Sequence, residues 1–394
     1  MLGWAWIAVI ASVPVQQLVY IETGPAIRYL PVLLGLVCAG LGRFSQYRGL
    51  PGTVAFGLLT LAGGLVSGFS TTVVASVTVA AWLALLVALV PGCLLFQVRR
   101  SDRFTTLATA GFLLVQSLSA LAGVLQSVGV SVLGFTARGG RVNGLAHHPN
   151  ILGLMAVVAV VVCLGLAVVG RGRRSILIGV VVLNIGVLLL SGSLSALLSL
   201  VVGLLCFVAI VRPWKLVLGA GAALATGVAV IGVGGADPRA VLPGVSDRAE
   251  EVVGASGEGV ASFLVRLDTY GFALDRIAES PVVGTGMDPA GQSTVTSDLV
   301  VHMMILRAWM QGGIFLLVAV TGIVVALAIF AVRAAATREL VGAAAVVVVL
   351  LVFGMTSTFY NQPHYWLPVL AGVAYLEAQR RSASDRTRGE GARP

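Results

Sequence analysis

Residues 150–170 read NILGLMAVVAVVVCLGLAVVG and contain no charged side chain. A helical membrane span needs about 20 consecutive, mostly apolar residues, and this run meets that requirement. Eleven further apolar runs occur near residues 3–20, 26–42, 52–68, 72–96, 104–126, 175–190, 194–211, 216–235, 300–332, 339–358 and 365–377. The sequence therefore predicts an all-α polytopic membrane protein with about 12 transmembrane helices.

The composition of the whole chain agrees with this prediction. Of its 394 residues, 58% are hydrophobic and 10% are charged, whereas a soluble domain carries about 25% charged residues. The net charge is +9, but the basic residues are spread thinly between apolar runs and form no patch for nucleic acid. The four cysteines lie inside apolar runs without metal-ligand spacing, and we interpret them as small buried hydrophobic residues.

The distribution of basic residues between loops predicts the orientation in the membrane. One alternating set of loops holds twelve basic residues and the other holds three, namely Arg28, Arg138 and Arg141. Since cytoplasmic loops are enriched in Lys and Arg, the first set is predicted to be cytoplasmic, together with both termini. The N-terminal stretch lacks a basic segment ahead of its apolar run, so we expect a first span and not a cleaved signal.

The sequence divides into four parts on this basis. Residues 1–235 form an N-terminal bundle of about nine spans, and residues 236–300 form a long extracytoplasmic loop that carries ten of the sixteen acidic residues. Within this loop, VASFLVRLDTYGFALDRIAES has the spacing of an amphipathic helix that Ser280 and Pro281 end. Residues 301–377 add about three spans, and residues 378–394 are predicted to be a disordered cytoplasmic tail.

Polar residues interrupt the apolar pattern most sharply at 141–153, RVNGLAHHPNILG. Asn150 is a good N-cap for the span that follows, which is one interpretation of its presence. His147 and His148 are adjacent and point in different directions, so a joint metal site is not expected. Arg138 and Arg141 either reach lipid phosphates at the interface or clamp a phosphate group of a substrate.

A second candidate lies in TSDLVVHMMILRAW, just after the long loop. Asp298 and His302 are spaced i, i+4, so both side chains can lie on one helix face. The carboxylate can fix the histidine tautomer, which would leave His302 as a base near neutral pH. The alternative is an interfacial histidine without chemistry.

Two further arginines belong to the candidate site. Arg307 lies deeper in the same span, where an arginine should face a polar cavity unless the helix starts unusually near the surface. Arg266 lies in the acidic loop and either binds an anionic ligand or pairs with Asp268 or Glu258.

Together these motifs resemble the O-antigen ligase and polymerase superfamily. RVNGLAHHPNILG resembles its Arg-x-x-Gly…His-Pro-Asn-x-x-Gly signature, RLDTYGFALDRIAESPVVGTGM resembles its outer-loop pattern, and HMMILRAWMQGGIFLLV is similar to its His-Asn-x-x-Leu…Glu-x-Gly helix start. The order of the three motifs matches, and the resemblance covers roughly residues 135–320.

The resemblance implies a metal-independent enzyme without a cofactor in the bacterial inner membrane, with its active site facing outward. Such enzymes transfer a glycan from a polyprenyl-diphosphate-linked oligosaccharide to a hydroxyl of an acceptor glycan or lipid-linked glycan. By resemblance, His302 assists attack by the acceptor and Arg266 binds the donor diphosphate with Arg141. Supporting positions are Arg138, His148, Asn150, Asp298 and Arg307.

Two departures from the family pattern leave the choice between ligase and polymerase open. Leu194 stands where many members carry a basic residue, and Met303 stands where an asparagine often follows the histidine. The positive charge that Leu194 does not provide is either lacking in this chain or supplied by another residue, such as Arg138 or Arg307. The alternative functions are a transporter or flippase of a lipid-linked glycan and a noncatalytic scaffold. The absence of a convincing repeat and the outer position of the ionisable residues favour the enzyme.

Overall fold

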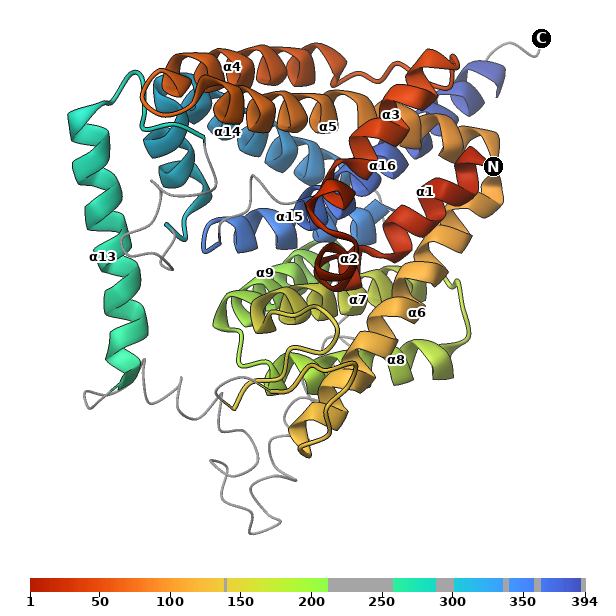
Figure 1. The fold of residues 1–394 in the computed structure, drawn as a ribbon. Helices are drawn as coiled ribbons and strands as arrows, with labels where there is room; N and C mark the ends of the chain where they lie inside the picture. Colours follow the sequence, from red (N-terminus) through yellow and green to blue (C-terminus); the bar gives the residue numbers. More distant parts are fainter. Residues whose placement is uncertain (138–139, 212–257, 288–300, 336–339, 358–362, 391–394) are drawn as a thin grey trace.

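Figure 1 shows the computed structural model of the chain, which describes all residues except 138–139, 212–257, 288–300, 336–339, 358–362 and 391–394. The described N-terminal elements are α1 (Leu2–Ala11), η1 (Val13–Val15), α2 (Gln16–Thr23), η2 (Pro25–Tyr29), α3 (Leu30–Gly40), α4 (Leu50–Gly68), α5 (Val73–Arg100), α6 (Asp102–Ser127), α7 (Pro149–Val168), α8 (Arg174–Leu190) and α9 (Leu194–Val211). The C-terminal helices are α13 (Glu258–Glu279), α14 (Met304–Ala335), α15 (Val341–Gly354) and α16 (Pro363–Glu390). Within these residues there is no β-strand, which confirms the predicted all-α class.

Among the described helices, five are long and apolar enough to cross a membrane, namely α4, α5, α6, α7 and α14. Shorter apolar helices follow much of the remaining pattern, so the predicted total of about 12 spans is not confirmed. A proline explains why one of the predicted spans is divided into shorter helices. The run 3–20 divides at η1, where Pro14 separates α1 from α2 because it has no backbone N–H to continue a helix. The run 216–235 lies outside the described residues.

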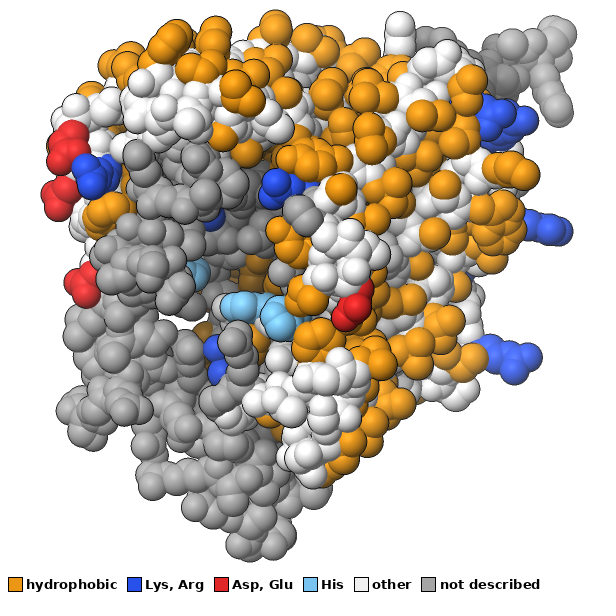
Figure 2. Space-filling view, viewed as in Figure 1, with side chains coloured by type: hydrophobic (Ala, Val, Ile, Leu, Met, Phe, Trp, Pro, Cys, Tyr) orange, Lys and Arg blue, Asp and Glu red, His pale blue; other side chains and the backbone are white. Residues whose placement is uncertain are grey.

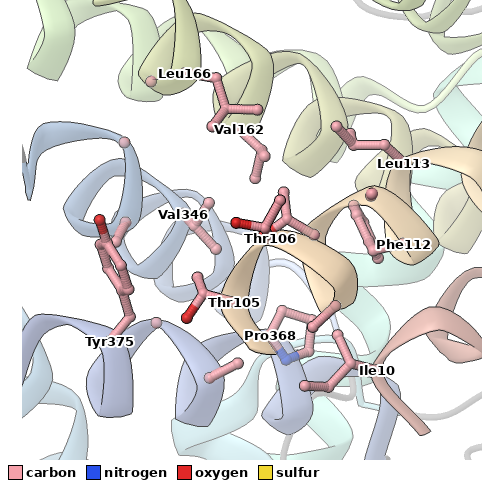
Figure 3. Close-up of a pocket in the computed structure, with 18 of the residues that line it drawn as sticks. Ile10, Thr105, Thr106, Phe112, Leu113, Val162, Leu166, Val346, Pro368 and Tyr375 are labelled. Atoms are coloured by element: carbon pink, nitrogen blue, oxygen red, sulfur yellow. The ribbon is translucent and has the colours of Figure 1, made fainter. Parts of the chain in front are cut away.

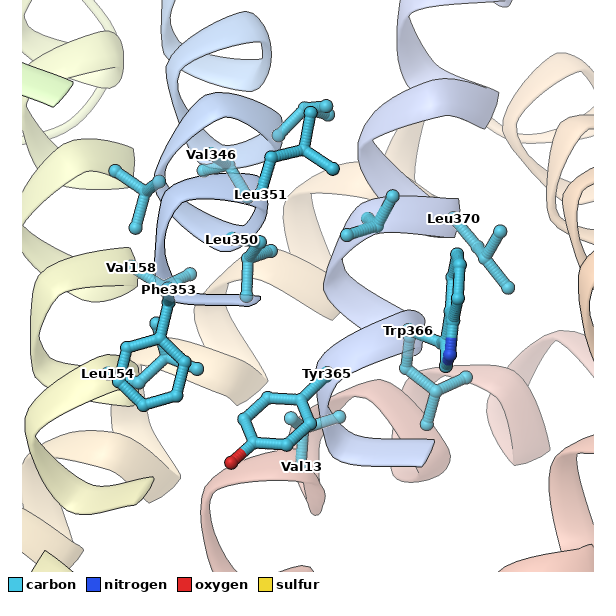
Figure 4. Packing of buried hydrophobic residues seen from close by; sticks show 14 of the residues in the cluster. Val13, Leu154, Val158, Val346, Leu350, Leu351, Phe353, Tyr365, Trp366 and Leu370 are labelled. Atoms are coloured by element: carbon cyan, nitrogen blue, oxygen red, sulfur yellow. The ribbon is translucent and has the colours of Figure 1, made fainter. Parts of the chain in front are cut away.

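Helix α7 lies at the centre of the bundle because it is hydrophobic on every face. In its apolar window 78% of the residues are buried, and it packs against α8, α9 and α15. At the crossing with α15, a β-carbon on Gly165 would lie only 2.7 Å from the Cα of Gly342, so glycine permits this close approach. Figure 4 shows this core, with Leu154 and Val158 of α7 near Val346 and Phe353 of α15.

Helices distant in the sequence complete one bundle. Helix α14 packs against α4, α16 against α5, and α15 against α9, and their buried side chains form one continuous hydrophobic cluster. The predicted division into N-terminal and C-terminal groups of spans therefore describes sequence order and not two separate bodies. Helix α16 also continues to Glu390, past residue 378, where the sequence predicts a disordered tail. Ala, Glu, Gln and Arg in this segment are good helix formers, which the charge-based prediction ignored.

Hydrogen bonds connect segments that the distribution of basic residues assigns to the same side of the membrane. Ser70 Oγ donates to the Gly284 carbonyl at 3.2 Å, and both residues belong to predicted outer loops. At the predicted cytoplasmic end, the Arg48 N–H donates to Glu377 Oε1 at 3.3 Å. Figure 2 shows basic side chains along the right-hand edge of the molecule, opposite α13 at the left of Figure 1. The fold thus has two chemically distinct ends, and their orientation in a membrane stays a prediction.

Candidate functional site

The segment RVNGLAHHPNILG begins as a loop that two buried polar side chains of α6 hold in place. Gln126 Oε1 accepts the N–H groups of Asn143 at 3.0 Å and Gly144 at 2.8 Å, and Ser119 Oγ accepts the N–H of Leu145 at 3.0 Å. Gly144 has φ 54°, and a β-carbon there would collide with the Ser119 carbonyl. The loop is therefore rigidly braced, because its buried backbone groups are satisfied and only glycine fits.

Arg141 links this loop to two helices. Its Nε donates to the carbonyl of Ser191, which follows α8, at 2.7 Å, and its Nη2 donates to Asn150 Oδ1, in the first turn of α7, at 2.8 Å. A guanidinium has five N–H donors, and these two hold protein atoms. One half-buried side chain thus fixes the start of α7 against the end of α8 and places a positive charge between them.

The prediction that Asn150 caps α7 is wrong, because His148 occupies that position. His148 Nδ1 accepts the N–H of Asn150 at 3.1 Å, and Pro149 is the first helical residue. Proline is favoured at this first position because it has no N–H that needs a partner, so the cap must precede it. The Asn150 side chain is thereby directed to Arg141 instead.

The two histidines of this segment occupy different environments, as their adjacency predicts. The ring of His147 is half-buried and meets the ring of Phe135 edge-on, with 5.1 Å between centroids, while His148 is exposed. His147 also adopts φ 61°, an uncommon conformation for a residue with a β-carbon. Each side chain is thus placed by its own local contacts, His147 by Phe135 and His148 by the start of α7.

The turn Ser191-Gly192-Ser193 lies against this cluster. A β-carbon on Gly153, the last residue of RVNGLAHHPNILG, would lie 2.9 Å from Ser193 Cβ and 3.0 Å from Ser191 Oγ. Glycine at 153 therefore lets α7 approach the turn closely. Leu194 follows the turn, and the guanidinium of Arg141 contacts the turn at the carbonyl of Ser191.

Helices α13 and α14 bring the second part of the candidate site together. Ala273 and Ile277 of α13 share a buried cluster with Met310 of α14 and with Val301, which precedes α14. The loop after α13 contacts α14 around the residues 310–314, so the first part of α14 runs in the same direction as α13, and the earlier turns of α13 extend toward the start of α14. Arg266 lies on one of these earlier turns, although its side chain is outside the described residues.

Helix α14 is broken at Gly313, which has φ 60° and ψ −156°. In a continuous helix the carbonyls of Met310 and Gln311 would accept N–H groups four residues later. The break leaves these carbonyls for the loop after α13. Thr285 N–H donates to Met310 at 2.8 Å and Gly286 N–H donates to Gln311 at 2.9 Å. The loop thus replaces the missing turn of helix hydrogen bonds.

The same loop, residues 281–287, is anchored on two further sides. The Ile314 N–H, beyond the break, donates back to the Val282 carbonyl at 3.2 Å. Toward the turn between α4 and α5, Met287 N–H donates to Ser76 Oγ at 3.0 Å. The Pro-x-x-Gly-x-Gly motif therefore forms a wedge between α14 and the α4–α5 turn, which fixes where α13 ends.

His302 and Arg307 lie at the start of α14. His302 is half-buried and precedes the helix by two residues. Arg307 lies in the first turns of the helix, is only 4% exposed, and donates through Nε to Gln311 Oε1 at 3.2 Å. The arginine thus points into the protein toward a polar partner and not toward lipid, as its cost in an apolar medium requires.

The described contacts build two groups at the predicted outer end. The first joins Arg141, Asn150 and Ser191, and the second joins Arg307 and Gln311 close to His302. Figure 2 shows that this face is hollowed near its centre and that histidine and basic side chains gather around the hollow. Arg138 and Asp298 lie outside the described residues, so their supporting roles stay predictions.

Sequence reasoning missed the residues that support the site. Gln126 and Ser119 are 2% and 0% exposed, and Gln311 is 1% exposed. Each is a polar residue inside an apolar run, and that contrast is the signal that would have found them, because a buried polar group needs a partner.

Residues 179–321 match the protein family described as O-antigen ligase. The matched span begins in α8 and ends in α14, so it includes the Ser191 turn, Arg266, the 281–287 wedge and His302. RVNGLAHHPNILG precedes it. No curated protein matches the chain.

Proposed function

The chain carries a domain of the O-antigen ligase family across residues 179–321, and from this premise we propose that it transfers a glycan from a polyprenyl-diphosphate donor to an acceptor sugar hydroxyl at the outer face of the bacterial inner membrane. The family and the apolar helices support the coarser statement that it acts on lipid-linked glycans within a membrane. The single observation that carries the finer proposal is the side-by-side packing of α13, which bears Arg266, with the first part of α14, which His302 precedes, both running in the same direction.

A lipid diphosphate is an anion at headgroup depth, and the proposed site offers it arginines. Guanidinium groups bind phosphate oxygens through paired hydrogen bonds and always carry their charge. In the proposal Arg266 contacts the diphosphate directly, and Arg141 adds charge from the opposite wall beside Ser191. In this proposal Arg141 supplies the positive charge that Leu194 does not provide, and neither Arg138 nor Arg307 is needed for that role.

His302 acts in the proposal as the general base. A neutral imidazole takes the proton of the acceptor hydroxyl as the hydroxyl oxygen attacks the anomeric carbon of the donor. The new bond joins that oxygen to the anomeric carbon, and the bond from this carbon to the diphosphate oxygen breaks. Polyprenyl diphosphate leaves with the bonding electron pair, and the arginines stabilise the charge that develops on it.

The 281–287 wedge has a positioning role in this proposal. General-base catalysis requires the base to lie within hydrogen-bond reach of the proton it removes, so the start of α14 must be held accurately. The wedge hydrogen-bonds to both sides of the break in α14 and to the α4–α5 turn. The wedge therefore connects the end of α13 to the first part of α14.

Transfer by the purified protein tests this function. Protein in lipid nanodiscs would be incubated with a defined polyprenyl-diphosphate oligosaccharide and an acceptor glycan, and the products separated by mass. We expect wild-type protein to form product and His302→Ala to lose about 10²–10⁴-fold in rate, the usual contribution of a general base. His364→Ala is the matched histidine control and should retain the wild-type rate.

The same reaction distinguishes the two forms of the activity. A single transferred unit indicates a ligase, whereas a ladder of products indicates a polymerase. Uptake of the lipid-linked glycan into liposomes without any product would contradict the enzyme and favour a transporter. An unchanged rate in His302→Ala would contradict the role assigned to His302.

A further inference from the structure

A second feature lies at the arginine-rich end of the bundle, opposite the proposed active site. It is a cavity of about 370 Å³ between α1, α5, α6, α7, α15 and α16. Figure 3 shows Ile10, Phe112, Leu113, Val162, Val346 and Pro368 around it, with the hydroxyls of Thr105, Thr106 and Tyr375 on the same lining. The proposed transfer reaction uses none of these residues.

The cavity is mostly apolar along its walls, with a few hydroxyl groups, and charged in one place. Among the described residues that line it, Arg171 is the charged one, and it lies in the turn between α7 and α8. A void lined mostly by apolar side chains offers water few hydrogen-bond partners, so it favours an occupant that is mostly hydrocarbon. Its volume is that of a site for one small-molecule-sized group, which suits one acyl chain and not a whole two-chain lipid.

The positive charge around Arg171 favours a ligand that has an anionic headgroup as well as a hydrocarbon chain. The chain segments 99–103 and 171–174 carry six arginines against the single acid Asp102. All six arginines are exposed, and Arg103 directly precedes Phe104, which lines the cavity. An anionic headgroup seated here would meet positive charge from both segments, and each basic residue near a membrane surface adds attraction for anionic lipid.

We propose that this cavity binds an anionic phospholipid of the leaflet at the arginine-rich end, which the sequence predicts to be cytoplasmic. One acyl chain enters between Phe112, Val162 and Val346, and the phosphate lies against Arg171. The donor lipid of the proposed reaction is not the occupant favoured here, because its diphosphate belongs at the opposite end of the bundle. In this proposal the hydroxyls of Thr105 and Thr106, which line the cavity, donate hydrogen bonds to the lipid ester groups.

Lipid retention measured by native mass spectrometry tests this site without any assay of transfer. The full-length protein in mild detergent would be titrated with phosphatidylglycerol, and separately with phosphatidylcholine of the same chains. Arg171→Gln removes the charge at the cavity, and Val162→Phe fills its wall. The matched controls are Arg333→Gln, an exposed arginine on α14, and Val182→Phe, an exposed valine that is 55% accessible on α8.

We expect phosphatidylglycerol to bind the wild type more tightly than phosphatidylcholine. Arg171→Gln should weaken phosphatidylglycerol binding about fivefold while leaving phosphatidylcholine unchanged, which is the effect of one basic residue at a membrane surface. Val162→Phe should weaken binding of both lipids, and the two control variants should bind as the wild type does.

Three results would overturn the proposal. They are equal binding of the two lipids by the wild type, wild-type binding by both Arg171→Gln and Val162→Phe, and displacement of phosphatidylglycerol from this cavity by a polyprenyl phosphate at equal concentration. The last result would assign the cavity to the tail of the donor. Loss of transfer in His302→Ala would be unaffected by any of them, so this proposal and the proposed function fail separately.

Discussion

Arg141 Nη2 donates to Asn150 Oδ1 at 2.8 Å, while Nε of the same guanidinium donates to the Ser191 carbonyl at 2.7 Å. These two bonds make Arg141 a structural link between α7 and α8 as well as a source of positive charge. Replacement of Arg141 should therefore affect both stability and substrate binding. Replacement of its partner Asn150 separates the two effects, because it removes one hydrogen bond and keeps the positive charge.

Asn150→Ala should lower stability while keeping the charge of Arg141. A hydrogen bond to a charged group contributes about 1.5–3 kcal/mol, and its loss should lower the temperature at which the detergent-solubilised protein loses its monodisperse peak. Donor binding should weaken less than in Arg141→Gln, which removes the charge as well. If Asn150→Ala and Arg141→Gln bound the donor equally well, the charge of Arg141 would have no part in binding.

The break in α14 should tolerate no β-carbon. In Gly313→Ala the new methyl group would collide with the Val282 carbonyl, and φ 60° is strained for alanine. We expect a loss of at least about 1–3 kcal/mol of stability. Gly322→Ala is the matched control on the same helix, because nothing lies within 4 Å of where its β-carbon would stand, and alanine in a helix should stabilise by up to about 1 kcal/mol. Equal thermal stability of the two variants would refute the wedge as the cause of the break.

The brace of Gln126 should be essential to the loop that holds Arg141. Gln126→Leu leaves the N–H groups of Asn143 and Gly144 without their acceptor, at a cost of about 1–3 kcal/mol for each buried group. Protease cleavage in the loop should become faster. Ser127→Ala, one residue further along α6 and exposed, should cleave at the wild-type rate. Unchanged cleavage in Gln126→Leu would show that the loop does not depend on this brace.

Labelling of two introduced thiols tests the orientation. Gly129 and Gly170 have φ 84° and φ 70°, and both have open space around them, so Gly129→Cys and Gly170→Cys should be equally tolerated. A membrane-impermeant maleimide applied to intact cells should label Gly129→Cys, whereas Gly170→Cys should require permeabilised cells. The opposite pattern would place the proposed active site in the cytosol and would contradict the use of an exported lipid-linked donor.

The sequence predicted well the features that depend on local pattern. The apolar runs indicated the helical class, and Ser280 with Pro281 marked the end of α13 at Glu279. It predicted the wrong cap for α7 because Asn150 is a good capping residue in isolation, whereas Pro149 is the first helical residue and moves the cap two residues earlier, to His148.

Features that depend on distant contacts could not be predicted from the pattern. Gly312 and Gly313 occur in an apolar run that reads as one span, and the break is stabilised by the loop 281–287, which precedes the helix in the sequence. In the same way, the partnership of Arg141 with Ser191 joins residues that no local spacing connects. Tertiary hydrogen bonding determined both arrangements.

The central claim is that Arg141, Arg266 and His302 act on one lipid-diphosphate donor, and a comparison of donor binding with turnover tests it most directly. Donor affinity and transfer rate would be measured for Arg141→Gln, Arg266→Gln and His302→Ala in nanodiscs. The two arginine variants should bind the donor about 10–100-fold more weakly, as the loss of a charge-assisted bond implies, whereas His302→Ala should bind it normally and lose turnover. Wild-type donor affinity in both arginine variants, or normal turnover in His302→Ala, would contradict the account.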